Sequence, residues 1–343
     1  MSTSKSPAEG IRVAIIGGGP AGLAAAIELA RLPFVDWHLY EQKPAISEIG
    51  TGITLQRSTW KLLETLGASK HLRAGDFFRP LDGHDNQYSN GLTSEVNLLI
   101  GADGIRSAVR SFAFPDHSVS YTGMTAYRAV VKVSDVEQIN GFSRATVFWY
   151  GTEGKIKEAD DGDRSTWGRE VSVAKFVERL QEYCEPVQKL LSLITHVRRF
   201  DYFGGTRLHS VIKHGSIALI GDASHPLSGA FGAGAAFALE DAHTLAGALH
   251  WAASSTRSLQ DALKLFDSVR SPYYGALYRT MDDIAASHEK TSREAASAEE
   301  EIVGRIENVS KSEHNWMLYH DVDQALEGAV LANKEAIRVK SLL

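Results

Sequence analysis

The chain has 343 residues, 43% of them hydrophobic and 23% charged, which is the composition of a globular protein with a sizeable core. The formal net charge of −6 argues against a nucleic-acid binder, which would normally carry a basic patch. The one cysteine, Cys184, excludes an internal disulfide framework and is a poor basis for a metal site. We find no signal peptide and no run of roughly 18 apolar residues, so we expect a cytoplasmic protein without a membrane span.

The chain opens on a β–α–β pattern. Residues 1–10 carry Ser, Lys and Pro and are expected to form a disordered tail. A short apolar strand is predicted at 11–16, an Ala- and Leu-rich helix at 21–32 and a second strand at 37–41. Such units usually belong to a parallel sheet, which indicates an α/β fold. A further helix is predicted at 59–66.

Polar stretches alternate with strands in the middle of the chain. Residues 73–94 are rich in Asp, Asn, Gly and Ser and indicate a loop. A strand is predicted at 96–100 and a short helix at 107–112. Further strands are predicted at 121–133 and 145–150.

Helical spacing dominates the remainder. It covers residues 173–193, and a strand is predicted after it at 216–220. A glycine-rich stretch then leads into a long helix of small residues at 235–249. From residue 259 the pattern is helical and charged to the end.

The order of these elements predicts the domain organisation. Nucleotide-type segments occupy 11–115 and 215–250, and the strand-bearing stretch 116–214 lies between them. We therefore expect a discontinuous Rossmann-type domain with an inserted, apparently shortened α+β domain. A helical C-terminal region would follow at 251–343.

The first candidate site is the loop Gly17-x-Gly19-x-x-Gly22, which follows the first strand. Gly17 permits a tight turn, Gly19 lets the backbone approach a pyrophosphate, and Gly22 permits close helix–sheet packing. The helix that starts at Ala21 offers free N–H groups and a partial positive charge to an anion. Glu41, at the end of the next strand, could accept hydrogen bonds from ribose hydroxyls, which favours FAD or NAD over NADP. The alternative is a structural turn beside a surface glutamate.

The second candidate site follows the strand at 216–220. Asp222 could accept a hydrogen bond from a sugar alcohol such as ribitol, and the glycines up to Gly234 let N–H groups approach a flat ring. The helix that starts near Ala235 directs its positive end at this place, where a reduced flavin carries negative charge. These features favour FAD over NAD. The alternative is an ordinary strand–loop–helix with a capping aspartate.

The third candidate site is Asp103-Gly104, which comes directly after the strand at 96–100. Basic residues follow this acidic turn, namely Arg106 and Arg110. The alternative is a β-turn that leads into a solvated helix.

Three motif-bearing stretches match one known family in sequence, order and separation. They are Val13–Leu23, Leu99–Ser107, and Gly221–Pro226 followed by Leu239–Ala242. A looser match covers Tyr121–Gly123 and Ala126–Arg128. Together the stretches resemble the flavin-dependent aromatic hydroxylases of the para-hydroxybenzoate hydroxylase type, and most closely their salicylate-hydroxylase-like branch.

The resemblance implies a FAD-dependent monooxygenase of phenolic or aromatic substrates, polyketide-derived ones included. In this chemistry NADH or NADPH reduces the flavin, O2 adds to give a C4a-hydroperoxyflavin, and one oxygen atom passes to the ring. Because the chain has one GxGxxG loop, the nicotinamide nucleotide would bind only transiently. The expected partners are a small aromatic substrate and O2, without nucleic acid, membrane or metal. The chain would be a monomer or a homodimer.

The resemblance also implies roles for single residues. The candidate catalytic residues are His225, as a base near the flavin ring, and Tyr127 and Arg128, facing the substrate. A structural role is the alternative for each of them. The cofactor-binding candidates are Gly17, Gly19, Ala21, Gly22, Glu41, Asp103, Gly104, Asp222, Ala233, Gly234 and Ala235.

The chain departs from the family at two places. Near 73–95 the family carries strands and a helix with an Arg followed by a Leu, whereas this chain is short and polar. Near 152–165 a charged, apolar-poor stretch replaces strands that floor the substrate pocket. A shortened, catalytically impaired flavoprotein is therefore one alternative. A FAD-dependent reductase or epoxidase of the same fold is another.

Overall fold

The computed structural model describes residues 10–42, 57–71, 95–140, 149, 168–227, 232–309 and 316–340. Several predictions fall mainly on other residues and lie outside the described part of the chain. These are the tail at 1–10, the loop at 73–94, the strand at 145–150 and the two shortenings near 73–95 and 152–165.

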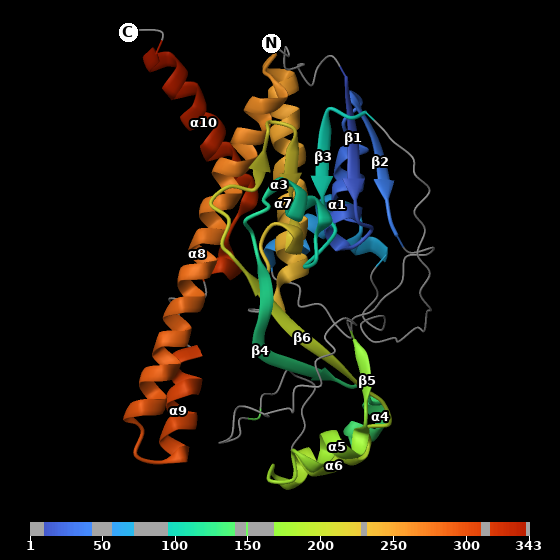
Figure 1. Ribbon diagram of the computed structural model, residues 1–343, viewed down its shortest axis with the longest axis vertical. Coiled ribbons are helices and arrows are strands. Elements are labelled where there is room, and N and C mark those ends of the chain that lie inside the picture. Colours follow the sequence, from blue (N-terminus) through green and yellow to red (C-terminus); the bar gives the residue numbers. More distant parts are fainter. Residues whose placement is uncertain are drawn as a thin grey trace.

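The main sheet has the strand order β2-β1-β3-β8-β7 (Figure 1). Four strands are parallel, and β7 joins the edge in the antiparallel direction. The bounds are β1 Ile11–Ile16, β2 Val35–Tyr40, β3 Leu98–Gly101, β7 Ile212–Lys213 and β8 Ile217–Leu219. The predicted parallel sheet is thus confirmed. The chain passes from β1 to its neighbour β2 and then continues with β3 on the other side of β1, so the strand order reverses at β1.

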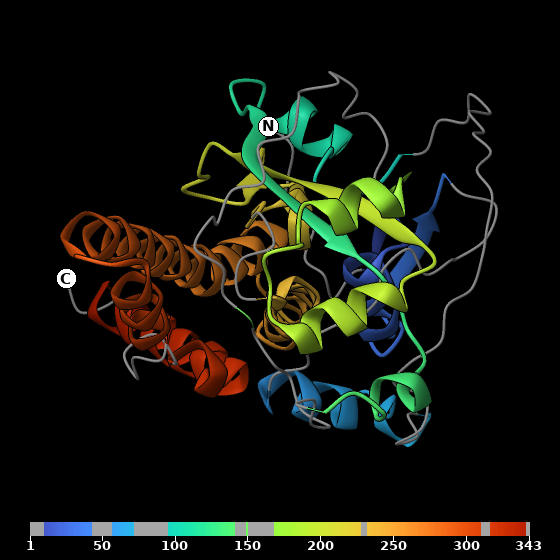
Figure 2. The same cartoon turned by 90° about the horizontal axis from the view of Figure 1, so that it is seen from below.

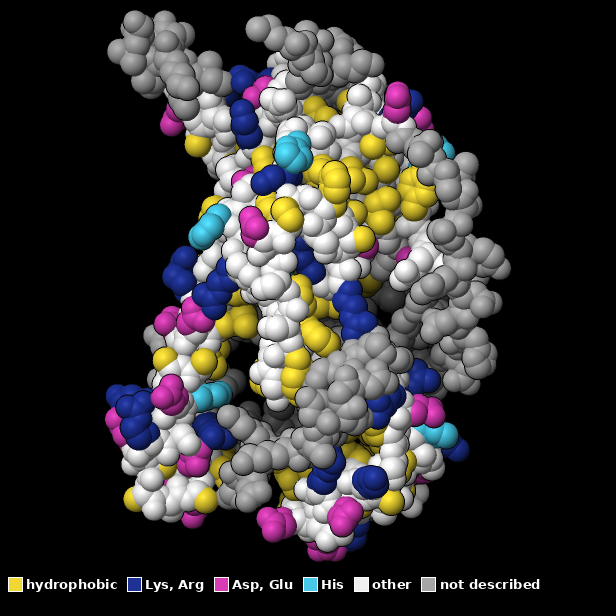
Figure 3. Space-filling model, in the orientation of Figure 1, with side chains coloured by type: hydrophobic (Ala, Val, Ile, Leu, Met, Phe, Trp, Pro, Cys, Tyr) yellow, Lys and Arg dark blue, Asp and Glu magenta, His cyan; other side chains and the backbone are white. Residues whose placement is uncertain are grey.

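Helices rich in alanine pack against this sheet. Helix α1 (Pro20–Leu29) lies against α7 (Gly234–Ser254), and the buried face of each consists mostly of small and aliphatic side chains. Pro20 occupies the first turn of α1, where its missing N–H leaves no hydrogen bond unmade. Helices α2 (Arg57–Thr65) and α3 (Ala108–Ala113) and the short η2 (Ser69–His71) complete this half. On the face in Figure 3, hydrophobic side chains gather over the region of β1 and β3.

A second sheet is antiparallel, with the order β4-β6-β5. Its strands are β4 (Val119–Arg128), β5 (Arg169–Val171) and β6 (Val197–Gly205). The predicted strand at 121–133 therefore ends early, and α4 (Val133–Val136) follows it. The predicted helical stretch at 173–193 is two helices, α5 (Val173–Glu178) and α6 (Glu185–Ser192), which lie below the second sheet in Figure 1 and in front of it in Figure 2.

The C-terminal part is helical, as predicted. Helix α8 (Leu259–Glu294) starts at a capping box made by Ser258 and Asp261, packs along α7 and then extends past it to α9 (Ala298–Val309). The turn η6 (Trp316–Tyr319) and α10 (Val322–Lys340) follow. Within the described residues, no helix is both long and apolar enough to cross a bilayer.

Candidate functional site

Three loops of the sequence prediction leave the main sheet at the carboxyl ends of its strands. In the order of the sheet, the first loop (Gly17–Gly22) follows β1, the second (Asp103-Gly104) follows β3 and the third (221–226) follows β8. Ile16 pairs with Gly101, and Gly101 pairs with Leu219, so β1, β3 and β8 end side by side. The pattern continues past the strands, because Ala102 N–H donates to Ile16 O at 2.8 Å and Ile220 N–H donates to Gly101 O at 2.9 Å. The carboxyl edge of parallel strands is where open α/β sheets bind ligands.

The first loop has one open glycine between two crowded ones. Gly17 has φ +109°, and an added Cβ would lie 2.4 Å from Ala102 O. A Cβ on Gly22 would lie 1.9 Å from Gly17 O. At Gly19, by contrast, an added Cβ would meet nothing within 4 Å. The loop therefore packs tightly at both ends and leaves free space at its tip, as a cradle for a pyrophosphate requires.

Glu41 and the start of α1 complete this loop. The Glu41 carboxylate accepts a hydrogen bond from Gly18 N–H at 2.5 Å, which places the acidic side chain against the glycines. Gly19 is the N-cap of α1, and no side chain caps the helix there. The N–H groups of the first turn, Ala21 and Gly22 included, are consequently available to an anion.

In the second loop, Asp103 is engaged in starting α3. Its carboxylate accepts hydrogen bonds from Ser107 Oγ at 2.5 Å, Ala108 N–H at 2.7 Å and Val109 N–H at 3.1 Å. Gly104 has φ +75°, and an added Cβ would meet nothing within 4 Å. The aspartate therefore shapes the turn, and Gly104 is the part of this loop with open space beside it.

Arg110 joins the second loop to the third. Its side chain is buried and donates hydrogen bonds to the carbonyl oxygens of Asp222 at 3.1 Å and Ala223 at 3.0 Å, and also to Ile105 O. Desolvation lowers the pKa of Arg110, and the negative charges of Asp103 and Asp222 oppose this lowering. The sequence showed Arg110 only as a basic residue on a solvated helix. Its carbonyl partners, more than 100 residues away, could not be seen there.

Asp222 is an open acceptor that faces an open helix end. Its side chain is exposed, yet the protein around it raises the pKa of the carboxyl by desolvation, an effect that Arg110 opposes. A Cβ on Gly234 would lie 3.6 Å from Asp222 Oδ1, and Ala233, the N-cap of α7, has no side-chain capping bond. The first turn of α7, with Ala235, thus points its free N–H groups at this place.

His225 is buried rather than open to a substrate. Its ring is 1% exposed and stacks on Tyr274, with centroids 3.5 Å apart and planes at 11°. Nδ1 lies 2.9 Å from Ser224 Oγ, and Nε2 has no hydrogen-bond partner among the described residues. Burial lowers the pKa of His225 well below its usual value, so the ring is neutral. Its assignment as a catalytic base stays a prediction.

Tyr127 and Arg128 lie at the other end of the second sheet. The Tyr127 hydroxyl accepts a hydrogen bond from Arg179 at 3.1 Å, and the Arg128 guanidinium lies 4.5 Å from the Phe200 ring centroid. Gly204 forms a bridge with Leu227 beside the third loop, and β4 runs from there to Tyr127 over about 20 Å. The structure therefore does not bring these two residues together with His225. That Tyr127 and Arg128 face a substrate stays a prediction.

A buried ion-pair network lies behind the third loop. Arg270 donates hydrogen bonds to Asp241 at 2.7 Å and to Glu240 at 3.0 Å, and all three side chains are at most 1% exposed. The sequence contains a signal for it that the prediction did not use. Two adjacent acidic residues within a helix of small apolar residues need a buried cation if that helix is in the core.

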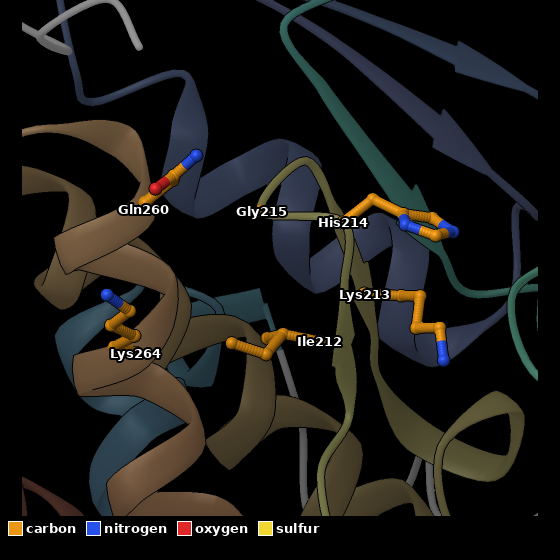
Figure 4. Close-up of a pocket in the computed structure, with 6 residues that line it drawn as sticks. All are labelled: Ile212, Lys213, His214, Gly215, Gln260 and Lys264. Carbon is orange, nitrogen blue, oxygen red and sulfur yellow. The ribbon is translucent and has the colours of Figure 1, made fainter.

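The cavity in Figure 4 lies elsewhere, at the amino end of β8. It has a volume of about 270 Å³ and is lined by Ile212, Lys213, His214, Gly215, Gln260 and Lys264. Figure 4 shows Lys213 and His214 pointing away from Lys264, so the charged groups do not converge on one ligand. No cluster of three potential metal-ligating side chains occurs among the described residues.

The three loops fit FAD by their own chemistry. Open space beside Gly19 and two uncapped helix N-termini suit the pyrophosphate and the flavin ring. The free carboxylate of Asp222 suits a ribitol hydroxyl, and Glu41 suits the ribose at the other end.

Comparisons with known proteins agree with this fit. The model of the "FAD binding domain" family matches residues 10–89 and 83–279. Salicylate hydroxylase of Pseudomonas putida is 26% identical over 415 aligned positions, which cover 93% of this chain and 94% of that protein. A solved substrate complex of salicylate hydroxylase has a TM-score of 0.66 at 20% identity, over 94% of this chain and 98% of that one.

A second solved structure carries the same fold. The protein CtdE in complex with FAD and its substrate has a TM-score of 0.68 at 16% identity, and covers 96% of this chain and 100% of its own. The predicted cofactor FAD, the Rossmann-type fold and the resemblance to salicylate hydroxylase are thereby confirmed. The chain belongs to the FAD binding domain family, as a FAD-dependent monooxygenase of the aromatic hydroxylase type.

Proposed function

We propose that this enzyme hydroxylates a small phenolic or aromatic acid. The reaction consumes O2 and NADH or NADPH, adds one oxygen atom to the ring and releases the other as water. The convergence of the three loops at one sheet edge carries the proposal, because it builds a FAD site from residues that lie far apart in the chain. Two further relatives, 3-hydroxybenzoate 6-hydroxylase of Klebsiella oxytoca and 6-hydroxynicotinate 3-monooxygenase of Pseudomonas fluorescens, act on ring acids and support this substrate class.

The chain's own residues would divide the cofactor between the loops. Gly19 and the first turn of α1 would hold the pyrophosphate, and Glu41 would hold the adenosine ribose. Asp222 would accept a hydrogen bond from the ribitol, while the N-terminus of α7 at Gly234 would face the ring. When bound, FAD supplies the reduction and oxygen-activating chemistry. The positive end of α7 would stabilise negative charge that develops on the ring.

We also propose a location and an assembly state. The chain has one cysteine, and that residue is exposed, so nothing in it requires an oxidising compartment. We place the enzyme in the cytoplasm as a monomer or homodimer. The division into a FAD domain (11–115 and 215–250), a substrate domain (116–214) and a helical region (251–343) is likewise proposed.

A second candidate is a shortened flavoprotein that binds FAD but turns over poorly. The alignment with salicylate hydroxylase spans 415 positions, more than the 343 residues of this chain, so it places gaps within the chain. Such gaps support the idea that this chain is shortened within the region that it shares with that relative. The two candidates share the FAD site and differ only in catalysis.

One experiment separates the two candidates. The purified protein is supplied with FAD, its visible spectrum is recorded, and NADH and NADPH oxidation is followed with salicylate, 3-hydroxybenzoate and 6-hydroxynicotinate. A hydroxylase gives a flavin spectrum, faster oxidation with one of these acids and a product that carries one extra oxygen atom. The impaired flavoprotein gives the spectrum without stimulation or product. A protein that is colourless after excess FAD has been added and the unbound FAD removed contradicts both candidates.

A further inference from the structure

The third loop is held from behind by one carboxylate. Asp241 Oδ2 accepts a hydrogen bond from Gly221 N–H at 2.8 Å and another from the Tyr274 hydroxyl at 2.7 Å. Its second oxygen accepts from Arg270 at 2.7 Å. Since Gly221 immediately precedes Asp222, the position of the Asp241 carboxylate fixes the backbone that carries the exposed acceptor.

Gly221 leaves this loop little freedom to settle elsewhere. It has φ +59°, and an added Cβ would lie 2.9 Å from the Ala21 Cβ and 3.3 Å from the Ala238 Cβ. The turn is therefore wedged between α1 and α7. A shift of Gly221 would move Asp222 relative to the first loop. This distance matters, because one dinucleotide must contact both loops at once.

Tyr274 contacts this loop directly at His225 and indirectly, through Asp241, at Gly221. Its hydroxyl donates to Asp241, which holds Gly221, and its ring stacks on His225 with centroids 3.5 Å apart. The side chain is 1% exposed and comes from the middle of α8, far from the loops in sequence. A buried aromatic ring with a partnered hydroxyl has one orientation, so it can define the place of both groups.

We propose that Tyr274 is a positioning residue of the FAD site, which sets the loop 221–226 so that Asp222 meets the cofactor. The proposal rests on the proposed role of Asp222. Tyr274 is buried and acts through its contacts with Asp241 and His225. Without the Tyr274 hydroxyl, the Asp241 carboxylate accepts one hydrogen bond fewer and prefers a different position. Gly221 must follow this shift, because its N–H donates to the same carboxylate.

The chain contains a matched control beside Tyr274. Tyr273 is the preceding residue of α8, is 5% exposed, and its hydroxyl has no hydrogen-bond partner among the described residues. Both tyrosine rings lie against the Arg270 guanidinium, at 4.5 Å for Tyr273 and 5.2 Å for Tyr274. Removing either hydroxyl deletes one buried oxygen next to the same charge, but only Tyr274→Phe deletes a hydrogen bond to Asp241.

The test compares Tyr274→Phe, Tyr273→Phe and the unmodified protein as apo chains. FAD affinity is measured by titration of flavin fluorescence, the bound flavin by its visible absorption bands, and folding by circular dichroism. All titrations are run at 10 °C with sucrose, which favours the folded state. We expect Tyr274→Phe to raise the Kd of FAD roughly tenfold and to shift the bound flavin bands, because one hydrogen bond to a charged group is lost. Tyr273→Phe should stay within about twofold of the unmodified protein.

The other outcomes overturn one claim each. If the unmodified protein binds no FAD, the proposed function fails before Tyr274 is tested. If the unmodified protein binds FAD and Tyr274→Phe binds it with the same Kd and bands, the positioning role is wrong, whatever happens to stability. A Tyr274→Phe chain that stays unfolded under these conditions also overturns it, because the residue is then needed for folding alone.

Discussion

At the scale of single residues, the first loop assigns opposite tasks to two glycines. Gly22 is needed by the fold, since a Cβ there would lie 1.9 Å from Gly17 O. Gly19 has φ −75° and ψ −176°, which any residue adopts, and a Cβ there would meet nothing within 4 Å. The space beside Gly19 is open, as the proposed pyrophosphate site requires.

We therefore predict different results for alanine at these two positions. Gly22→Ala should lower the free energy of unfolding by about 3 kcal/mol or more, because backbone must move to relieve the clash. Gly19→Ala should leave it unchanged or raise it by up to about 1 kcal/mol, because alanine restricts the unfolded chain. The same Gly19→Ala chain should bind FAD at least about tenfold more weakly. Chemical denaturation and FAD titration measure the two quantities. Equal FAD affinity of Gly19→Ala and the unmodified chain would remove Gly19 from the pyrophosphate site.

The glycine loops were predictable from sequence, whereas the buried charges were not. Gly17, Gly19 and Gly22 have fixed spacing within one turn, so local sequence contains their geometry. Arg110 and Arg270 look like surface residues in the sequence, and only their partners show that they are buried. These partners are carbonyl oxygens at Asp222 and Ala223 for the first, and the carboxylates of α7 for the second.

At the scale of elements, His243 joins three helices. Its Nδ1 lies 2.6 Å from Glu28 of α1, and its Nε2 lies 2.8 Å from Asp323 of α10. Lys61 of α2 reaches Asp323 at 3.4 Å, and Arg31 reaches Glu28 at 3.5 Å, so both carboxylates also face a cation. Burial of the ring opposes protonation, but the two carboxylates outweigh it and raise the pKa of His243 above 6.5.

This arrangement predicts a pH-dependent contribution to stability. Because the folded pKa is raised, the contribution is fully present below the unfolded pKa of 6.5 and is lost as pH rises through the folded pKa. At pH 6, His243→Gln should destabilise the chain by about 2 kcal/mol, the value of hydrogen bonds to charged groups, and at pH 9 by less. Thermal melts across this pH range measure the difference. His250→Gln is the control, since His250 is exposed on the same helix. A difference that stays constant or grows with pH would contradict the ion pairs.

Element boundaries show where sequence patterns fail. The stretch 173–193 has helical spacing throughout, but Pro186 stands in the first turn of α6, where a continuous helix would lose a hydrogen bond and clash. Strand β6 was not predicted, because its inward face carries the buried pair Arg199 and Asp201. Two charges on a core face hide the apolar–polar alternation by which strands are detected.

At the scale of the whole molecule, the proposed FAD site depends on distant parts of the chain. Its loops follow β1, β3 and β8, and α8 supports the last of them through Arg270 and Tyr274. The sequence predicted the three loops and the parallel sheet that joins them. It could not predict the support from α8, since no local pattern relates residue 274 to residue 241. A ligand that touches all three loops must therefore stabilise the fold as a unit.

We predict that FAD raises the melting temperature of the apo chain in a concentration-dependent way. A ligand that binds only the folded state stabilises it by about 2.7 kcal/mol at 100 times its Kd, which in a chain of this size shifts the melting temperature by roughly 4 °C. FMN lacks the adenosine monophosphate part of FAD and cannot reach Glu41, so it should shift the melting temperature less. Gly19→Ala should reduce the shift with FAD, whereas His250→Gln should change neither shift. Equal shifts with FAD and FMN would mean that the adenosine part is not held, and the proposed role of Glu41 and the three-loop site would be wrong.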